Sequence, residues 1–241
     1  MSDIVTYQLE DSIATITMDD GKVNALSLQM FSELNAAFDR AKTDGAVVVF
    51  TGREGKFSAG FDLGALRAGG TDAAALLRAG FELAERVLSF PTPVVIACNG
   101  HAIAMGVFLL LSGDYRIGVD GPYKINANEV ALGMTMPRTA IEICRQRLAP
   151  AHFNRAIILA EPYSPADAVA AGFLDRVVEA SELQNVARST AALLANLNMD
   201  AHSASKLRAR DDALTAIRAA IEADDADFQN IAGIAAAAQG A

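Results

Sequence analysis

Two runs of consecutive apolar residues constrain the fold of this chain more than any other feature. They are AVVVF at residues 46–50 and VVIAC at residues 94–98. Strands that are apolar on both faces need cover on both sides, which is typical of the inner strands of a parallel sheet. A helical pattern over residues 73–88 separates the two runs and ends before Pro91 and Pro93. Because parallel strands need such a crossover, the sequence predicts an α/β fold with a largely parallel sheet.

The same alternation of strands and helices extends to either side of these runs. Residues 5–9 and 13–18 read as two strands joined as a hairpin. Ser27 is the predicted N-cap of the next helix. That helix repeats apolar residues at spacings of three and four, namely Phe31, Leu34, Phe38 and Ala41. Residues 105–111 are expected to form a buried helix, and residues 115–119 a further strand.

The chain becomes mainly helical after Pro137, and we expect this third of it to serve packing and assembly. The expected elements are helices over residues 138–147, 151–160 and 165–171, a strand over 173–178, long Ala-rich helices over 181–222 and a terminal helix over 224–241.

Composition and charge exclude several classes of protein. A hydrophobic content of 52% is enough for a sizeable core, and a net charge of −9 argues against nucleic-acid binding, which needs a basic surface. Cys98 and Cys144 lack metal-type spacing, so we expect both in the core rather than in a disulfide or a zinc site. The first residues do not resemble a signal peptide, and the longest apolar stretch, residues 102–111, is too short to span a bilayer. We therefore expect a cytoplasmic protein without a membrane partner.

Two short motifs stand where strands of the predicted sheet end. FSAGFDL occupies residues 57–63, and NGHAIAMG occupies residues 99–106. Both contain small residues that allow a tight turn into a helix, and ligands bind at the carboxyl ends of parallel strands. Together the motifs can direct two backbone N–H groups at one oxygen, as catalysis through an oxyanion requires. The alternative is an ordinary strand-to-helix turn at each position.

These motifs and four others resemble, in order and spacing, the crotonase superfamily, also called the enoyl-CoA hydratase/isomerase family. The other stretches are KVNALS at residues 22–27, DYRI at 114–117, NEVALG at 128–133 and ADAVAAGFLD at 166–175. The resemblance runs nearly from end to end of the chain. It implies a crotonase-like ββα spiral core over residues 1–190 and a helical trimerisation region over residues 191–241. Homotrimers or dimers of trimers are the implied assemblies.

The resemblance implies an enzyme that acts on acyl-CoA thioesters. CoA then enters as part of the substrate, and neither a metal nor a separate cofactor is expected. In such an enzyme the backbone N–H groups of Phe61 and Met105 bind the thioester oxygen. Many relatives have Gly where Met105 stands, but any residue other than proline keeps its N–H group. We therefore expect Met105 to narrow the pocket without removing the hydrogen bond.

Glu129 is the candidate acid and base, because NEVALG matches the stretch that carries a catalytic glutamate in this family. The hydratases use two glutamates, and the first falls where this chain has Phe108. Water addition is better served by two carboxylates, whereas one suffices to move a proton along the acyl chain. The pattern favours a Δ3,Δ2-enoyl-CoA isomerase, with 2-enoyl-CoA hydration and acyl-CoA binding without catalysis as alternatives. Phe108 is expected to exclude water from the cavity, although ordinary packing in a helix explains it equally well.

The resemblance also assigns contacts with CoA or the acyl group. Lys22 and Ala25 match positions near the nucleotide and pantetheine in relatives, and Ala59 lies in the same loop at the end of a strand. Lys206 matches a lysine of the C-terminal helices that can reach a phosphate, including one bound to a neighbouring subunit. A solvated lysine on a helix is the alternative for Lys206. Asp62 is expected among the residues that bind the substrate, where it caps or braces the turn beside Phe61. Asp114 and Arg116, in contrast, match a structural element, and we expect them to form buried ion pairs.

Overall fold

The main sheet places the two apolar runs at its centre, in the strand order β1-β2-β4-β7-β9-β11. The structure, a computed structural model, describes the backbone of residues 3–239 and the side chains of residues 3–229. β1 and β2 pair antiparallel as the predicted hairpin, and the remaining neighbours pair parallel, which confirms the predicted sheet. The strands are β1 (Val5–Glu10), β2 (Ile13–Met18), β4 (Val47–Thr51), β7 (Val94–Cys98), β9 (Tyr115–Val119) and β11 (Arg176–Val178).

Short strands continue the chain beyond the carboxyl ends of the long ones and form two small sheets. In one, β10 (Ile125–Asn126), β8 (Gly100–Ile103) and β5 (Gly55–Ser58) pair parallel, and in the other β3 (Ala25–Leu26) pairs with β6 (Gly60–Phe61). A Cβ on Gly100 would lie 2.0 Å from the carbonyl carbon of Gly55, so β5 and β8 approach more closely than a side chain permits. The two motifs thus form strands as well as turns.

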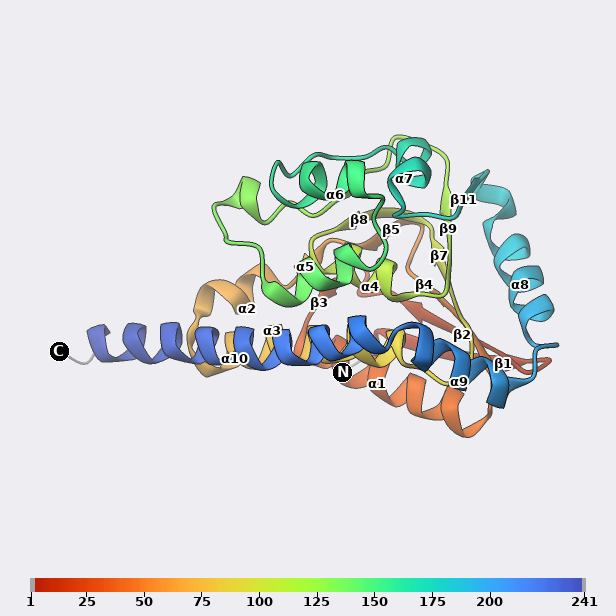
Figure 1. Cartoon of the computed structure of the whole chain (residues 1–241), viewed down its shortest axis with the longest axis horizontal. Helices are drawn as coiled ribbons and strands as arrows, with labels where there is room; N and C mark the ends of the chain where they lie inside the picture. The colour runs from red at the N-terminus through yellow and green to blue at the C-terminus, as the bar shows by residue number, and fades with distance from the viewer. Residues whose placement is uncertain (1–2, 240–241) are drawn as a thin grey trace.

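Helices cover both faces of the main sheet (Figure 1). Alternate residues of β4 show the division, because Val47 and Val49 pack with α8 whereas Val48 and Phe50 pack with α1, α3 and α4. The helices are α1 (Leu28–Thr43), α2 (Leu63–Ala68), α3 (Gly70–Leu88), α4 (Met105–Ser112), α5 (Arg138–Arg145), α6 (Pro150–Ile157), α7 (Pro165–Ala171), α8 (Leu183–Leu194), α9 (Met199–Ala209) and α10 (Asp211–Gln239), with 3-10 turns at η1 (Val130–Leu132) and η2 (Ala180–Glu182).

Local signals in the sequence explain several of these boundaries. The Ser27 hydroxyl accepts the N–H of Met30 at 3.1 Å and begins α1, as predicted. The predicted apolar face of α1 is buried, and the Phe38 ring packs edge-to-face on Phe50 and Phe90. Cys98 and Cys144 are free and buried in the core, as expected.

Three predicted boundaries were wrong. The helical region expected from residue 73 begins at Leu63, the first residue of α2. Gly69 and Gly70, both with φ of +69°, separate α2 from the rest of α3. The strand expected over residues 173–178 is limited to β11, since Gly172 ends α7 in a left-handed conformation and Phe173 packs in the core.

The third error concerns the C-terminal helices. α10 continues through the break expected near residue 223, where no Gly or Pro interrupts it, and residues 240–241 lie outside the described residues. Residue 190, the expected domain boundary, lies in α8, which packs on the main sheet, and the division into two domains stays a prediction.

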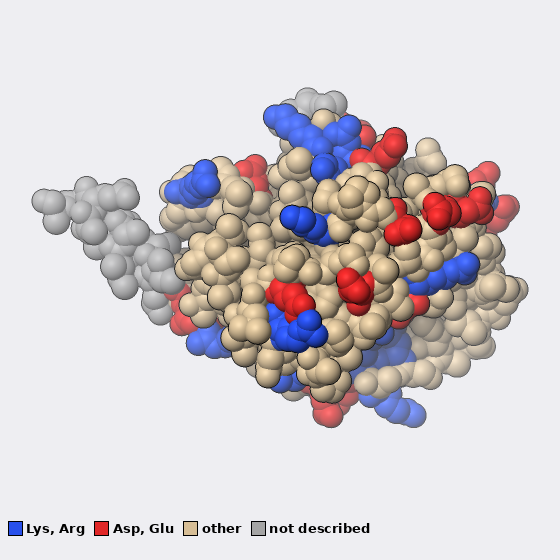
Figure 2. Space-filling view, turned by 90° about the horizontal axis from the view of Figure 1, so that it is seen from above, with Lys and Arg blue, Asp and Glu red and all other residues tan. Residues whose placement is uncertain are grey.

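Acidic and basic side chains are interspersed in small groups over a largely uncharged surface on the face shown in Figure 2. Within residues 3–239, no helix is both long and apolar enough to cross a membrane.

Candidate active site

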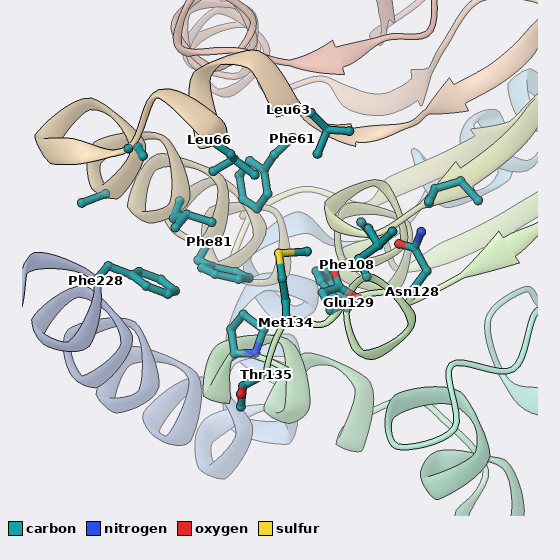
Figure 3. A pocket seen from close by; sticks show the side chains of 18 of the residues that line it. Phe61, Leu63, Leu66, Phe81, Phe108, Asn128, Glu129, Met134, Thr135 and Phe228 are labelled. Carbon is teal, nitrogen blue, oxygen red and sulfur yellow. The ribbon is translucent and has the colours of Figure 1, made fainter. Parts of the chain in front are cut away.

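A cavity of about 640 Å³ lies beside the short strands, between α2, α3, α10 and the segment of residues 128–137. Figure 3 shows side chains from these separate elements turned toward a common space. Most of the wall is apolar, and Asn128, Glu129 and Thr135 are its polar side chains among the described residues. The fold therefore builds an apolar chamber with a few convergent polar groups, as small-molecule sites do.

Glu129 is the one carboxylate among the described residues that line this cavity. Its backbone carbonyl accepts the N–H groups of Leu132 and Met134, so a tight turn fixes the residue after β10. The side chain is buried, with 6% of the residue exposed, and its Oε2 atom has no hydrogen-bond partner among the described residues. Burial disfavours the charged form and raises the pKa of Glu129 to about 7. Such a group can take up and release a proton near neutral pH.

The two motifs that were expected to supply backbone donors approach each other closely at the cavity. A Cβ on Gly60 would lie 2.9 Å from the Ala104 Cβ and 3.3 Å from the Met105 nitrogen, so this contact requires glycine. Met105 begins α4, and the first N–H groups of a helix have no acceptor within it. The helix dipole also favours negative charge at this end. Phe61 and Ala104 line the cavity, and the use of the Phe61 and Met105 amides as oxyanion donors stays a prediction.

Ala104, the residue before α4, has a strained backbone. Its φ of +49° and ψ of −123° belong to a region that residues with a Cβ rarely adopt. Strain of this kind persists only where the surrounding structure enforces it, and it is concentrated at functional sites. The turn that presents the start of α4 to the cavity is therefore held by its neighbours rather than by local preference.

Phe108 belongs both to the core and to the cavity wall. It is 1% exposed, lines the cavity, and its ring centroid lies 6.3 Å from that of Phe81. Its two predicted roles, packing and exclusion of water, are therefore compatible. Met105 differs from expectation, because its side chain is buried in the core and does not narrow the cavity. Its backbone, not its side chain, is what approaches the site.

The other predicted contact residues lie at different distances from this cavity. Ala59 lines it, and Ala25 pairs with Gly60 across β3 and β6, so the segment that contains the exposed Lys22 follows the same edge. Asp62 does not line the cavity. Its carboxylate accepts the N–H groups of Gly64 and Ala65 and caps α2, as expected for a residue that braces this turn.

Lys206 does not line the cavity and is paired with another residue. Its ammonium group lies 2.7 Å from Asp114, which also pairs with Arg210 at 2.9 Å. Only 4% of the lysine side chain is exposed, and burial lowers its pKa to about 8. The alternative of a solvated lysine does not fit this placement, because the group is buried and paired with Asp114, and its contact with a CoA phosphate stays a prediction.

Asp114 and Arg116 form ion pairs, as expected, but with other residues rather than with each other. Arg116 is 3% exposed and binds Asp175 at 2.7 Å, and Asp114 binds the two cations of α9 and its C-terminal end. These pairs connect the edge of the main sheet with the helical part of the chain.

Several residues of the cavity were not predicted from the sequence. They are Asn128, Met134 and Thr135 near Glu129, Gly69 and Gly70 at the junction of α2 and α3, and Phe228 of α10. An isolated aromatic residue within an Ala-rich helix was the available signal for Phe228. Among the residues that the structure describes, no group of three or more His, Cys, Asp or Glu is arranged to hold a metal ion.

Comparison with known proteins gives consistent similarities over most of the chain. The sequence model of the Enoyl-CoA hydratase/isomerase family matches residues 8–238. The human mitochondrial enoyl-CoA delta isomerase 1 is 31% identical over 224 residues, which cover 90% of this chain and 73% of the human protein.

Two solved structures from Mycobacterium tuberculosis have the same fold. One, titled as an enoyl-CoA isomerase in its apo form, is 50% identical with a TM-score of 0.91 and covers 95% of this chain and 100% of its own. The other, titled as a probable enoyl-CoA hydratase, is 49% identical with a TM-score of 0.92 and covers 96% and 99%. The chain therefore belongs to the enoyl-CoA hydratase/isomerase family and is an enzyme of the crotonase type.

Proposed function

We propose that this enzyme is a Δ3,Δ2-enoyl-CoA isomerase with Glu129 as its single proton-transferring group. The Glu129 carboxylate removes a proton from C2 of a 3-enoyl thioester, and the electron pair moves onto the thioester oxygen. The N–H groups of Phe61 and Met105 stabilise that oxyanion. Glu129 then returns the proton to C4, which leaves the double bond between C2 and C3. The reaction consumes no water and transfers no electrons to a cofactor.

The observation that carries this proposal is that Glu129 is the one carboxylate on the cavity wall among the residues that the structure describes. Phe108 occupies the position at which the resemblance expects the first hydratase glutamate, and it lines the cavity as an apolar ring. Hydration requires that a water molecule be held and deprotonated while a proton is delivered to C2, a task that suits two carboxylates. Isomerisation returns the same proton to the same molecule, so a dry cavity with one glutamate favours it.

The pKa of Glu129 supports the same role. A base that also serves as an acid works best when its pKa lies near the working pH, and burial raises that of Glu129 to about 7. The nearby start of α4 can compensate the negative charge that develops on the substrate.

Hydration of 2-enoyl-CoA is the second candidate, because similar proteins are named both as isomerases and as hydratases. The two activities are separated by assays of the purified protein with a 3-enoyl-CoA and a 2-enoyl-CoA. Migration of the double bond supports the proposal, whereas net water addition as the main reaction contradicts it. Binding without turnover of either compound points instead to an acyl-CoA-binding protein.

The role of Glu129 is tested by Glu129→Gln, which keeps the shape of the side chain but removes its basicity. We expect the rate of migration to fall by at least about 10²-fold, because general acid–base catalysis contributes that much. Glu179→Gln is the matched control, since Glu179 is an exposed glutamate outside the cavity. Near-normal migration in Glu129→Gln would exclude Glu129 as the proton carrier.

A further inference from the structure

The cavity extends well beyond the groups proposed for catalysis. Asn128 and Glu129 lie at one end of it, and Figure 3 shows Phe228 at a separate end, with Phe81 between them. The wall along this path comes from apolar residues of α2 and α3, including Leu66. Apolar surface of this kind binds hydrocarbon rather than the polar pantetheine arm of CoA.

The volume of the cavity indicates the size of the hydrocarbon. At about 30 Å³ for each water-sized group, 640 Å³ holds about 20 non-hydrogen atoms. Ala59 and Phe61 line the same cavity, so the thioester and the adjoining end of pantetheine take part of this space. A four-carbon acyl group would still leave the path toward Phe228 empty, and an unfilled apolar cavity loses the contacts its lining would otherwise make. The dimensions therefore fit an acyl chain much longer than four carbons.

Asp224, one helical turn before Phe228, fixes the position of this part of α10. Asp224 is buried, and its carboxylate accepts the N–H groups of Arg138 and Thr139 at 3.0 and 2.8 Å and the Thr139 hydroxyl at 2.8 Å. Asp224 thereby caps α5, whose own N-cap, Pro137, supplies no side-chain hydrogen bond. Because residues four apart share one face of a helix, this anchor fixes the direction in which Phe228 points.

Ion pairs between α10 and α3 also help to hold this part of α10 in place. Arg78 of α3 binds Glu222 at 2.7 Å and Asp225 at 3.0 Å, so α10 is tied both to α3 and to α5. The far wall of the cavity thus consists of a helix fixed at two points, with Phe228 as its aromatic contribution.

We infer that Phe228 is a specificity-determining residue that limits the length of the acyl chain, and that the enzyme takes medium to long acyl groups. The inference rests on the proposed acyl-CoA substrate but not on whether the reaction is isomerisation or hydration. A shorter side chain at position 228 extends the cavity, and a larger one shortens it. The two changes must therefore move chain-length preference in opposite directions.

The test measures binding of saturated hexanoyl-, decanoyl- and tetradecanoyl-CoA by calorimetry, which needs no turnover. The wild-type protein is expected to bind decanoyl-CoA more tightly than hexanoyl-CoA. Phe228→Ala is expected to raise the affinity for tetradecanoyl-CoA relative to decanoyl-CoA by about tenfold, and Phe228→Trp to lower the same ratio by about tenfold, because a hydrophobic pocket distinguishes single methylene groups by at least that factor. Ratios of kcat/KM for the matching enoyl-CoAs provide a second measurement.

Ile221→Ala is the matched control, since Ile221 is a buried residue of α10 that does not line the cavity, and it should leave the ratios unchanged. Unchanged ratios in both Phe228 variants, with circular dichroism spectra like that of the wild type, overturn the inference. So does tighter binding of hexanoyl-CoA than of decanoyl-CoA by the wild type. If no double-bond migration is detected while the binding ratios shift as expected, the proposed isomerase activity fails and the role of Phe228 stands.

Discussion

Glu129 is placed where a carboxylate is costly to the folded state. It lies in an apolar cavity, and its Oε2 atom has no hydrogen-bond partner within the described residues. The same burial that makes the group useful near neutral pH therefore opposes folding whenever the group must ionise. Ala104 adds local strain beside it. At the scale of single residues, the site has been shaped for chemistry at the expense of stability.

This cost predicts how stability depends on pH. The ordinary pKa of a glutamate is 4.5, and in the folded protein that of Glu129 is about 7. Between these values the unfolded chain releases a proton that the folded chain keeps, so the free energy of unfolding falls as pH rises from 4.5 to 7. Glu129→Gln removes this dependence. At about pH 8 we expect the variant to be more stable than the wild type by about 3 kcal/mol, with little difference at about pH 4.5.

Urea denaturation of both proteins across this pH range measures the effect, and Glu179→Gln controls for the loss of a surface charge. In parallel, kcat/KM of the wild type should rise with pH, reach half its maximum near pH 7 and level off above about pH 8, because the base must be ionised in the free enzyme. Equal stabilities of wild type and Glu129→Gln at about pH 8 would contradict the placement of a buried carboxylate in this apolar cavity.

The sequence predicted part of the candidate site and missed the rest for a physical reason. Phe61 was predicted from a motif at the end of a strand, whereas Phe108 and Glu129 were predicted from the family resemblance, and all three line the cavity. Phe228 was not found, because its contribution depends on how a distant helix packs. Lys206 was assigned to CoA, but its position in three dimensions puts it beside Asp114. A motif reveals local geometry, whereas pairing across the fold is set by tertiary packing.

At the scale of elements, the bounds of strands with a clear sequence pattern were predicted closely. β2, β7 and β9 have the expected bounds, since each is a short segment rich in apolar and β-branched residues between turn residues. The short strands β5, β8 and β10 lack such a pattern, and their pairing follows from the close approach of glycines such as Gly100 to neighbouring backbone. The break predicted within α10 was wrong. The charged residues in the middle of this helix resemble a helix boundary in the sequence, but they form the contacts that hold α10 on α3 and α5.

Asp224 provides the prediction for this scale. We expect Asp224→Ala to lower the free energy of unfolding by about 2–3 kcal/mol, because it leaves the start of α5 without an acceptor for two backbone N–H groups. Asp227→Ala is the matched control, since Asp227 also pairs with Arg138 but is 54% exposed, and it should change stability little. Urea denaturation measures both. Equal effects of the two substitutions would show that the cap is not what anchors α10.

At the scale of the whole molecule, several large apolar side chains of the single chain are exposed. Leu159 at the end of α6 is 71% exposed and Leu193 of α8 is 74% exposed. Exposed apolar groups are often covered by a partner, and the family resemblance implies a trimer or a dimer of trimers. We expect analytical ultracentrifugation to give the mass of a trimer or a hexamer. A sedimentation coefficient of a single chain at all concentrations would contradict this expectation.

The position of Phe228 late in the chain has a consequence for synthesis. The ribosome synthesises Glu129 and the strands around it before α10. The part of the cavity wall that contains Glu129 is therefore present in the nascent chain while the part that contains Phe228 is still missing. The wall that Phe228 contributes is therefore present only after α10 has been synthesised and has docked on α3 and α5.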